Sequence, residues 1–185
     1  FKMVTSSAAV QEGIAGGNET YFCPGGKNVS GTYIKCWKPD GHGTETFDQI
    51  LENSCNVGFM DIGQKLGKEK LNEYIEKFGF GKQTGIDLPG ETTGIVLPND
   101  KIGPVELATI SFGQTDSASS VQMMAAMNTI ANGGTWIQPH IMKEISHEDT
   151  SGARVVDKTF VPKKIDNIID QKTAMRVSEA LEKTV

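Results

Sequence analysis

Residues 78–98 read FGFGKQTGIDLPGETTGIVLP, and the rest of the chain is organised around this stretch. Glycine and proline recur along it, which predicts a turn-rich connection rather than a helix or a long strand. Just before it, the segment KEKLNEYIEKFG places Leu71, Tyr74, Ile75 and Phe78 at the three- and four-residue spacing of an amphipathic helix. The stretch therefore marks the point where one helical region ends and the chain crosses to another.

Toward the N-terminus the pattern is mostly helical, with one loop-rich interruption. Helices are predicted over residues 2–12, from about Thr46 as the N-cap, and over residues 56–66, where apolar residues recur on one face. Residues 14–46 are rich in glycine and proline, and Ser30-Gly31 predicts the turn of a short hairpin over residues 29–37.

Toward the C-terminus helical and hairpin patterns alternate. A short helix is predicted over residues 104–111, a hairpin within 136–160 that turns at 149–152, and a last helix over about 170–183. Between them, SASSVQMMAAMNTIANGG (residues 117–134) predicts a strong helix. We expect that helix to bury Val121, Met124, Ala125, Asn128 and Ile130. There is no repeat and no second core, so the pattern indicates one domain.

Composition excludes several classes of protein. The 185 residues carry a net charge of −5, whereas a general nucleic-acid binder needs a basic face to neutralise phosphates. No apolar run approaches the ~20 residues of a membrane span, and the start of the chain does not resemble a signal peptide. The hydrophobic fraction of 37% is ordinary for a globular domain.

Four short stretches, taken in order, suggest a family. Phe1-Lys2 precedes MVTSSAAVQEG, Ser54-Cys55-Asn56 is a Ser-x-Asn tripeptide, and SFGQ (residues 111–114) is followed by a helix that ends in ANGGTWIQPHI. With residues 78–98 between them, these stretches resemble the transpeptidase domain of class B penicillin-binding proteins, in the elongation and sporulation branch. The resemblance covers nearly the whole chain. One departure is SASSVQ, where the family usually has a Thr-Pro pair.

The resemblance implies that residues 1–185 are a partial transpeptidase domain, truncated at both ends. Phe1-Lys2 would end the family's Ser-x-x-Lys motif, with the nucleophilic serine two residues before Phe1, and the Lys-Thr-Gly motif would follow the last residue. The implied fold is the α+β fold of penicillin-binding proteins and serine β-lactamases, a five-stranded antiparallel sheet flanked by helices. This chain would supply mainly the helical lobe.

The implied activity is that of a peptidoglycan D,D-transpeptidase. A serine attacks the D-Ala-D-Ala end of a stem peptide, releases the last D-Ala and passes the acyl group to an amine of a neighbouring strand; β-lactams trap the same serine. Without that serine the chain itself is expected to be inactive. The implied partners are stem peptides, lipid-linked wall precursors, β-lactams and a glycosyltransferase. The implied location is the outer face of the cell membrane, through an N-terminal anchor.

Three residues of this chain take catalytic roles in this interpretation. A serine hydroxyl needs a neighbouring base, and Lys2 would lie one turn after the nucleophile, where the positive helix end and nearby groups lower the lysine pKa. Ser54 would relay a proton to the leaving amine, and Asn56 would hydrogen-bond the amide of the substrate. Ser-x-x-Lys sets of this kind occur in β-lactamases and penicillin-binding proteins, where the identity of the base is disputed.

A second group of residues has the composition of a metal site. Cys23, Cys36, His42 and Cys55 offer three thiolates and one imidazole, a set that suits a closed, structural zinc site. The first three lie in a glycine-rich loop that buries little apolar surface, so a metal cross-link would help to order it. Some relatives in the elongation and sporulation branch hold zinc near the active site, which implies the same four ligands here.

Alternatives to both assignments stay open on sequence alone. Cys23 and Cys36 could form a disulfide and leave Cys55 free, or all three cysteines could be unligated packing residues. Asp40 and Glu19 are spare oxygen ligands if one cysteine is not used. The alternative functions are a non-enzymatic β-lactam sensor of the same fold and a zinc-binding cell-wall interaction module. The second leaves residues 78–98 and SFGQ unexplained.

Overall fold

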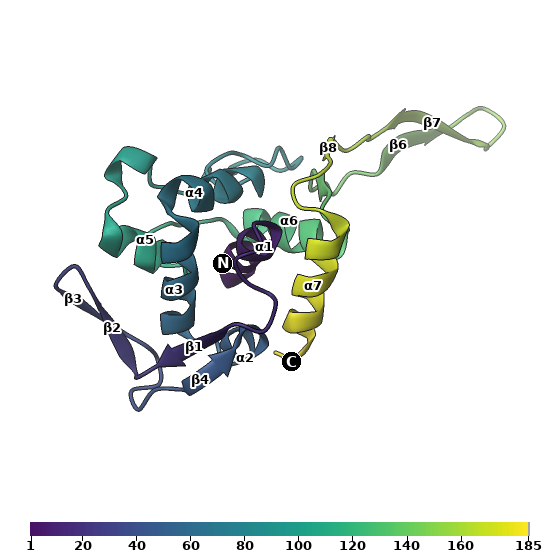
Figure 1. Cartoon of the computed structure of the whole chain (residues 1–185). Coiled ribbons are helices and arrows are strands. Elements are labelled where there is room, and N and C mark those ends of the chain that lie inside the picture. The colour runs from purple at the N-terminus through teal and green to yellow at the C-terminus, as the bar shows by residue number, and fades with distance from the viewer. Residues whose placement is uncertain (185) are drawn as a thin grey trace.

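The computed structural model describes residues 1–184, which form a helical assembly edged by short hairpins (Figure 1). The helices within these residues are α1 (Lys2–Gln11), α2 (Phe47–Glu52), α3 (Asn56–Leu66), α4 (Lys68–Lys77), the 3₁₀-helix η1 (Asn99–Lys101), α5 (Pro104–Ile110), α6 (Ser120–Ala131) and α7 (Gln171–Glu182). The strands are β1 (Thr20–Cys23), β2 (Gly26–Val29), β3 (Thr32–Lys35), β4 (Gly43–Thr46), β5 (Trp136–Ile137), β6 (Glu144–Glu148), β7 (Arg154–Thr159) and β8 (Lys164–Ile165).

The strands pair only in twos, all antiparallel: β1 with β4, β2 with β3, β5 with β8 and β6 with β7. The described residues therefore contain no five-stranded sheet, in keeping with the prediction that this chain supplies mainly the helical lobe of an α+β fold. The β6–β7 hairpin projects away from the helices (Figure 1), and every residue of β7 is exposed. No helix within residues 1–184 has both the length and the apolar character needed to span a bilayer.

Helix α1 occupies the centre of the assembly, packed by α3, α4 and α7 (Figure 1). Seven consecutive residues from Met3 to Ala9 are buried, so this helix is covered on every side. The small residues in this run allow close approach, and two of their hydroxyls donate to carbonyl groups, whereas Ser6 Oγ is buried without a hydrogen-bond partner in the described part of the chain. Thr5 Oγ1 donates to the Ser111 carbonyl at 2.8 Å, and Ser7 Oγ donates to the Met3 carbonyl at 2.8 Å.

Most predicted element boundaries are confirmed because their capping signals are present. Thr46 caps α2 in a capping box with Gln49, and Asp170 caps α7 by accepting from the Thr173 N–H at 2.6 Å. The Ser30-Gly31 turn joins β2 to β3, and residues 149–152 lie in the turn between β6 and β7.

The predicted buried face of α6 is confirmed at Ala125 and Ile130 and is wrong at Val121, Met124 and Asn128. Met124 is 63% exposed and Asn128 is also exposed, whereas the buried residues are Gln122, Ala125, Ala126, Thr129 and Ile130. Polar Gln122 was not expected in the core. Its amide nitrogen donates to the carbonyls of Lys82 at 2.7 Å and Thr93 at 2.8 Å, so it ties α6 to the turn-rich connection.

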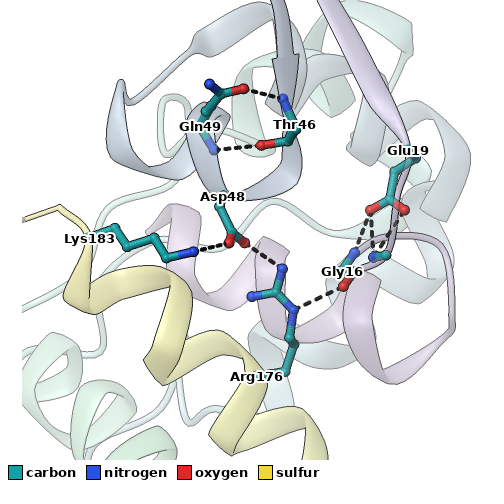
Figure 2. A network of polar contacts seen from close by, with 8 residues as sticks. Gly16, Glu19, Thr46, Asp48, Gln49, Arg176 and Lys183 are labelled. Atoms are coloured by element: carbon teal, nitrogen blue, oxygen red, sulfur yellow. Dashed lines mark hydrogen bonds and ion pairs between the residues drawn. The ribbon is translucent and has the colours of Figure 1, made fainter.

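A polar network fastens α7 to α2 and to the loop after α1 (Figure 2). Asp48 in the first turn of α2 pairs with Arg176 and, at 2.5 Å, with Lys183 of α7. Arg176 Nε also donates to the Gly16 carbonyl at 2.9 Å. Burial acts to raise the pKa of Asp48, but Lys183 and Arg176 outweigh burial and the net pKa is lowered.

Substitution Asp48→Asn is expected to lower the free energy of unfolding by about 1 kcal/mol at neutral pH, because the partly buried pairs lose their charge. Since the folded pKa lies below the unfolded value of about 3.9, the stabilisation is present above that pH and is lost as the pH falls below it. Urea unfolding at several pH values measures this, with exposed Asp100→Asn as the control. A deficit that persisted unchanged in acid would contradict the charge explanation.

Candidate active site and metal centre

The three predicted catalytic residues meet at the junction of α2 and α3. Lys2 lies in the first turn of α1, and its Nζ is 2.7 Å from Ser54 Oγ, 2.9 Å from the Ser54 carbonyl oxygen and 2.9 Å from Asn56 Oδ1. Lys2 and Ser54 are 52 positions apart in sequence, so the fold alone brings them together. The predicted convergence of Lys2 with the Ser-x-Asn tripeptide is thus seen in the geometry.

The pKa of Lys2 is lowered on balance, although two nearby aromatic rings attract a charged ammonium group. Its Nζ lies 5.6 Å from the ring centre of Phe59 and 6.0 Å from that of Phe112. Burial lowers the pKa of Lys2, while charge on Cys36 and Cys55 would act to raise it. Burial, rather than the helix end invoked from the sequence, is the larger cause. The neutral amine can donate to the two carbonyl-type oxygens and accept from the Ser54 hydroxyl.

Ser54 has an unusual backbone conformation that sets its direction. Its φ is +50°, in the left-handed region that side-chain-bearing residues rarely adopt. Such a conformation costs of order 1–3 kcal/mol and persists only where the surroundings enforce it. Here it turns the chain sharply between α2 and α3, so that Ser54 Oγ faces Lys2 while Cys55 begins the next helix as its N-cap.

Two of the predicted catalytic residues, Lys2 and Ser54, border an open hollow of about 650 Å³. Lys2 and Ser54 line it together with apolar side chains from α1, α2, α6 and α7. The apolar lining residues are Phe1, Met3, Leu51, Phe112, Met123, Met127 and Leu181, and Glu52 and Thr184 also line the hollow. The hollow therefore offers an apolar wall and a polar edge, the usual composition of a small-molecule site.

The predicted metal ligands also converge, next to the catalytic residues. Cys23 ends β1, Cys36 follows β3, His42 precedes β4 and Cys55 caps α3. One ligand atom from each of the four lies within 4.8 Å of the others. Cys36 Sγ is 3.7 Å from His42 Nδ1, close to the edge of a tetrahedron with metal–ligand bonds of about 2.0–2.3 Å.

Local chain geometry explains why this cluster forms. The β1–β4 register places Cys23 opposite Gly43, beside His42. Gly41 has φ +78°, and a Cβ there would lie 2.3 Å from the Cys23 carbonyl, so the loop closes only with glycine at this position. The donor set therefore fits zinc both in its chemistry and in its spacing.

The thiols of this cluster differ in their surroundings. Burial acts to raise the pKa of Cys36, but hydrogen bonds from the backbone N–H groups of Lys38, Asn56 and Val57 and from Cys23 outweigh it, and the net pKa is lowered. Burial raises the pKa of Cys55, and the nearby Glu45 carboxylate adds to that effect against the Gly58 N–H. A cation among the sulfurs would oppose the cost of ionising them.

Two of the alternatives left open by the sequence are not seen in the structure. Cys23, Cys36 and Cys55 are all free thiols, so no Cys23–Cys36 disulfide is formed. Neither spare oxygen ligand joins the cluster. The Glu19 carboxylate instead accepts from the N–H groups of Gly16 and Gly17, where it closes the loop after α1 (Figure 2).

Sequence reasoning missed three residues that surround the site. Glu45 is buried between His42 and Asn53, and its Oε1 accepts from Asn53 Nδ2 at 2.8 Å. Trp37 is 61% exposed and donates from Nε1 to the Asn53 carbonyl at 2.8 Å. Glu45 could have been noticed in the sequence, because it takes the inward-facing position of the alternating run Thr44-Glu45-Thr46, where a charged residue is unusual.

The comparison with known families gives a single assignment for the whole chain. The family described as the penicillin binding protein transpeptidase domain matches residues 1–185. The chain belongs to this family. Its class B assignment is confirmed by relatives such as stage V sporulation protein D of Bacillus subtilis, which is 41% identical over 186 residues, covering 100% of this chain and 28% of that relative.

Two further relatives agree with this transpeptidase assignment. Peptidoglycan D,D-transpeptidase MrdA of Acinetobacter baumannii is 31% identical over 117 residues, which cover 58% of this chain and 17% of that protein. The crystal structure of penicillin binding protein 3 from Mycobacterium tuberculosis is similar with a TM-score of 0.84 and 30% identity, covering 99% of this chain and 40% of that one. The transpeptidase domain described here thus spans less than half of each of these relatives, and the expected α+β fold is confirmed.

Proposed function

We propose that this domain forms part of a serine D,D-transpeptidase that cross-links peptidoglycan stem peptides and is acylated by β-lactams. The observation that carries the proposal is the contact of Lys2 Nζ with Ser54 Oγ and Asn56 Oδ1 on the border of the hollow. A β-lactam is known to bind a structural relative, since penicillin binding protein 3 of Mycobacterium tuberculosis has been solved with ampicillin and with aztreonam.

Each residue has a role that its contacts support. Lys2, which is half-buried, would take the proton of the family's nucleophilic serine as that serine attacks the D-Ala-D-Ala carbonyl. Ser54, hydrogen-bonded to Lys2, passes the proton to the departing D-Ala amine. Asn56, whose Nδ2 makes only a long 3.4 Å contact with the Lys35 carbonyl, turns toward the substrate amide. The acyl group then passes to an amine of a neighbouring strand.

The test is acylation of the intact protein, with that serine in place, by a fluorescent penicillin, together with release of D-Ala from a stem pentapeptide. We expect both, and we expect Asn56→Ala to weaken both. Absence of a covalent adduct on the intact wild type would contradict the proposal. A lasting adduct without D-Ala release from the pentapeptide would instead favour a β-lactam sensor of the same fold.

The setting of the reaction follows from its substrates. Lipid-linked wall precursors lie at the outer face of the bacterial membrane, so we place the domain there, held by an anchor elsewhere in the protein. A glycosyltransferase partner would supply the glycan strands to be joined. The likeness to stage V sporulation protein D makes spore-wall synthesis the first process to examine.

We also propose that Cys23, Cys36, His42 and Cys55 hold one zinc ion. The support is the donor chemistry and the convergence of the four ligand atoms, which all lie within 4.8 Å of one another. All four positions would be filled by protein atoms, so the metal would be structural, cross-linking β1, the loop after β3, the loop before β4 and the start of α3.

A further inference from the structure

Glu45 connects the metal cluster to the catalytic loop but belongs to neither. It is 3% exposed, and its Oε1 accepts from Asn53 Nδ2 at 2.8 Å. Its Oε2 is buried, lies 3.8 Å from His42 Nδ1 and has no hydrogen-bond partner within residues 1–184. Burying a carboxylate with so few hydrogen-bond partners lowers the stability of a fold. The presence of Glu45 at this buried position is therefore better explained by a functional role.

Asn53, the partner of Glu45, is held at both its side chain and its main chain. Glu45 accepts from the side-chain amide, while Trp37 Nε1 donates to the carbonyl oxygen at 2.8 Å. The Asn53 N–H in turn donates to the Gln49 carbonyl at 2.8 Å and ends α2. The next residue is Ser54, with its φ of +50°. Fixing Asn53 therefore fixes the start of the strained turn.

We propose that Glu45 is a positioning residue for transpeptidation, which acts through Asn53 to hold Ser54 Oγ against Lys2 Nζ. Without the Glu45 bond, the Asn53 side chain is released and Ser54 can relax toward an ordinary backbone conformation. That movement would lengthen the 2.7 Å contact between Ser54 Oγ and Lys2 Nζ. A displacement of about 1 Å in a catalytic group can cost about 100-fold in rate. The inference rests on the proposed function.

The matched pair Glu45→Gln and Glu45→Ala tests the hydrogen bond itself. Glutamine keeps an oxygen that accepts from Asn53 Nδ2, whereas alanine does not. In the intact protein, we expect Glu45→Ala to reduce the rate constant of acylation at saturating fluorescent penicillin by about 10–100-fold. Its dissociation constant for the penicillin should change little. Glu45→Gln should stay near the wild type, as should the exposed control Glu76→Ala.

A double-mutant cycle with Asn53→Ala tests the route. Because both changes break one link, the double variant should be no slower than the slower single variant. If the double variant instead acylates more slowly by the product of the two single-variant reductions, Glu45 does not act through Asn53. Wild-type acylation by Glu45→Ala, or acylation by Glu45→Gln as slow as by Glu45→Ala, would overturn the proposal. If Glu45→Ala does not fold, the test uses the other two variants. Slow acylation by Asn53→Ala together with near-wild-type acylation by Glu45→Gln would then support the proposal, and any other combination would overturn it.

Two controls distinguish this proposal from an effect on the zinc site and from a failure of the proposed function. The melting temperature and zinc content of Glu45→Ala are measured beside its acylation. We expect both to match the wild type, and slow acylation accompanied by loss of zinc would overturn the proposal, because Glu45 would then act through the metal site. If the wild type itself is not acylated, the proposed function fails; a fast wild type with a fast Glu45→Ala contradicts only the role of Glu45.

Discussion

Substitution Lys2→Ala in the intact protein is expected to reduce acylation by a fluorescent penicillin by about 10³-fold, since loss of a general base typically costs 10²–10⁴-fold. The reason is that the Lys2 amine is the group that touches both Ser54 and Asn56 and that would follow the nucleophile by one helical turn. Stopped-flow measurement of the acylation rate constant checks this. The control is Lys172→Ala, an exposed lysine in the first turn of α7.

The pH dependence of acylation provides an independent check on Lys2. Burial lowers its pKa, so the neutral amine forms at lower pH than in an exposed lysine. Acylation should rise with pH as Lys2 loses its proton, and the midpoint should lie below the ordinary lysine value of about 10.4. A midpoint at the ordinary value, or acylation by Lys2→Ala near the wild-type rate, would remove Lys2 from the mechanism.

Substitution His42→Ala is expected to abolish tight zinc binding and to lower the free energy of unfolding by about 4 kcal/mol when free zinc is 1,000-fold above the dissociation constant. Residues 14–46 contain many turns and glycines, so a cross-link among their ligands should contribute strongly to their order. Elemental analysis should give one zinc per wild-type chain. Thermal melting should show a decrease of about 10 °C for the variant.

The matched control for His42 is His147, an exposed histidine on β6 that pairs with Asp157 at 2.8 Å. His147→Ala should keep its zinc and its melting temperature. A chelator should reproduce the His42→Ala effect on the wild type, and zinc affinity should fall in acid because the thiols must lose their protons to bind. A wild-type protein purified without zinc, and unaffected by added zinc, would contradict the four-ligand site.

Local structure can be predicted from the sequence wherever capping and turn residues are present. Thr46 and Asp170 begin α2 and α7, and Ser30-Gly31 forms the turn between β2 and β3, because each signal acts within a few residues. The order of motifs also placed the chain in its family, and with it Lys2, Ser54 and Asn56. Residue type, the glycine-rich loop and the family resemblance together predicted Cys23, Cys36, His42 and Cys55 as metal ligands.

The surroundings of these residues depend on how the helices and strands pack against one another. The buried face of α6 depends on the carbonyls that Gln122 reaches 29 and 40 positions away, which no helical periodicity contains. The lowered pKa of Lys2 arises mainly from burial beneath other elements. The link from Glu45 to Asn53 exists because β4 and the end of α2 pack together. Capping and turn signals act within a few residues, whereas burial and long-range hydrogen bonds exist only once the helices have packed.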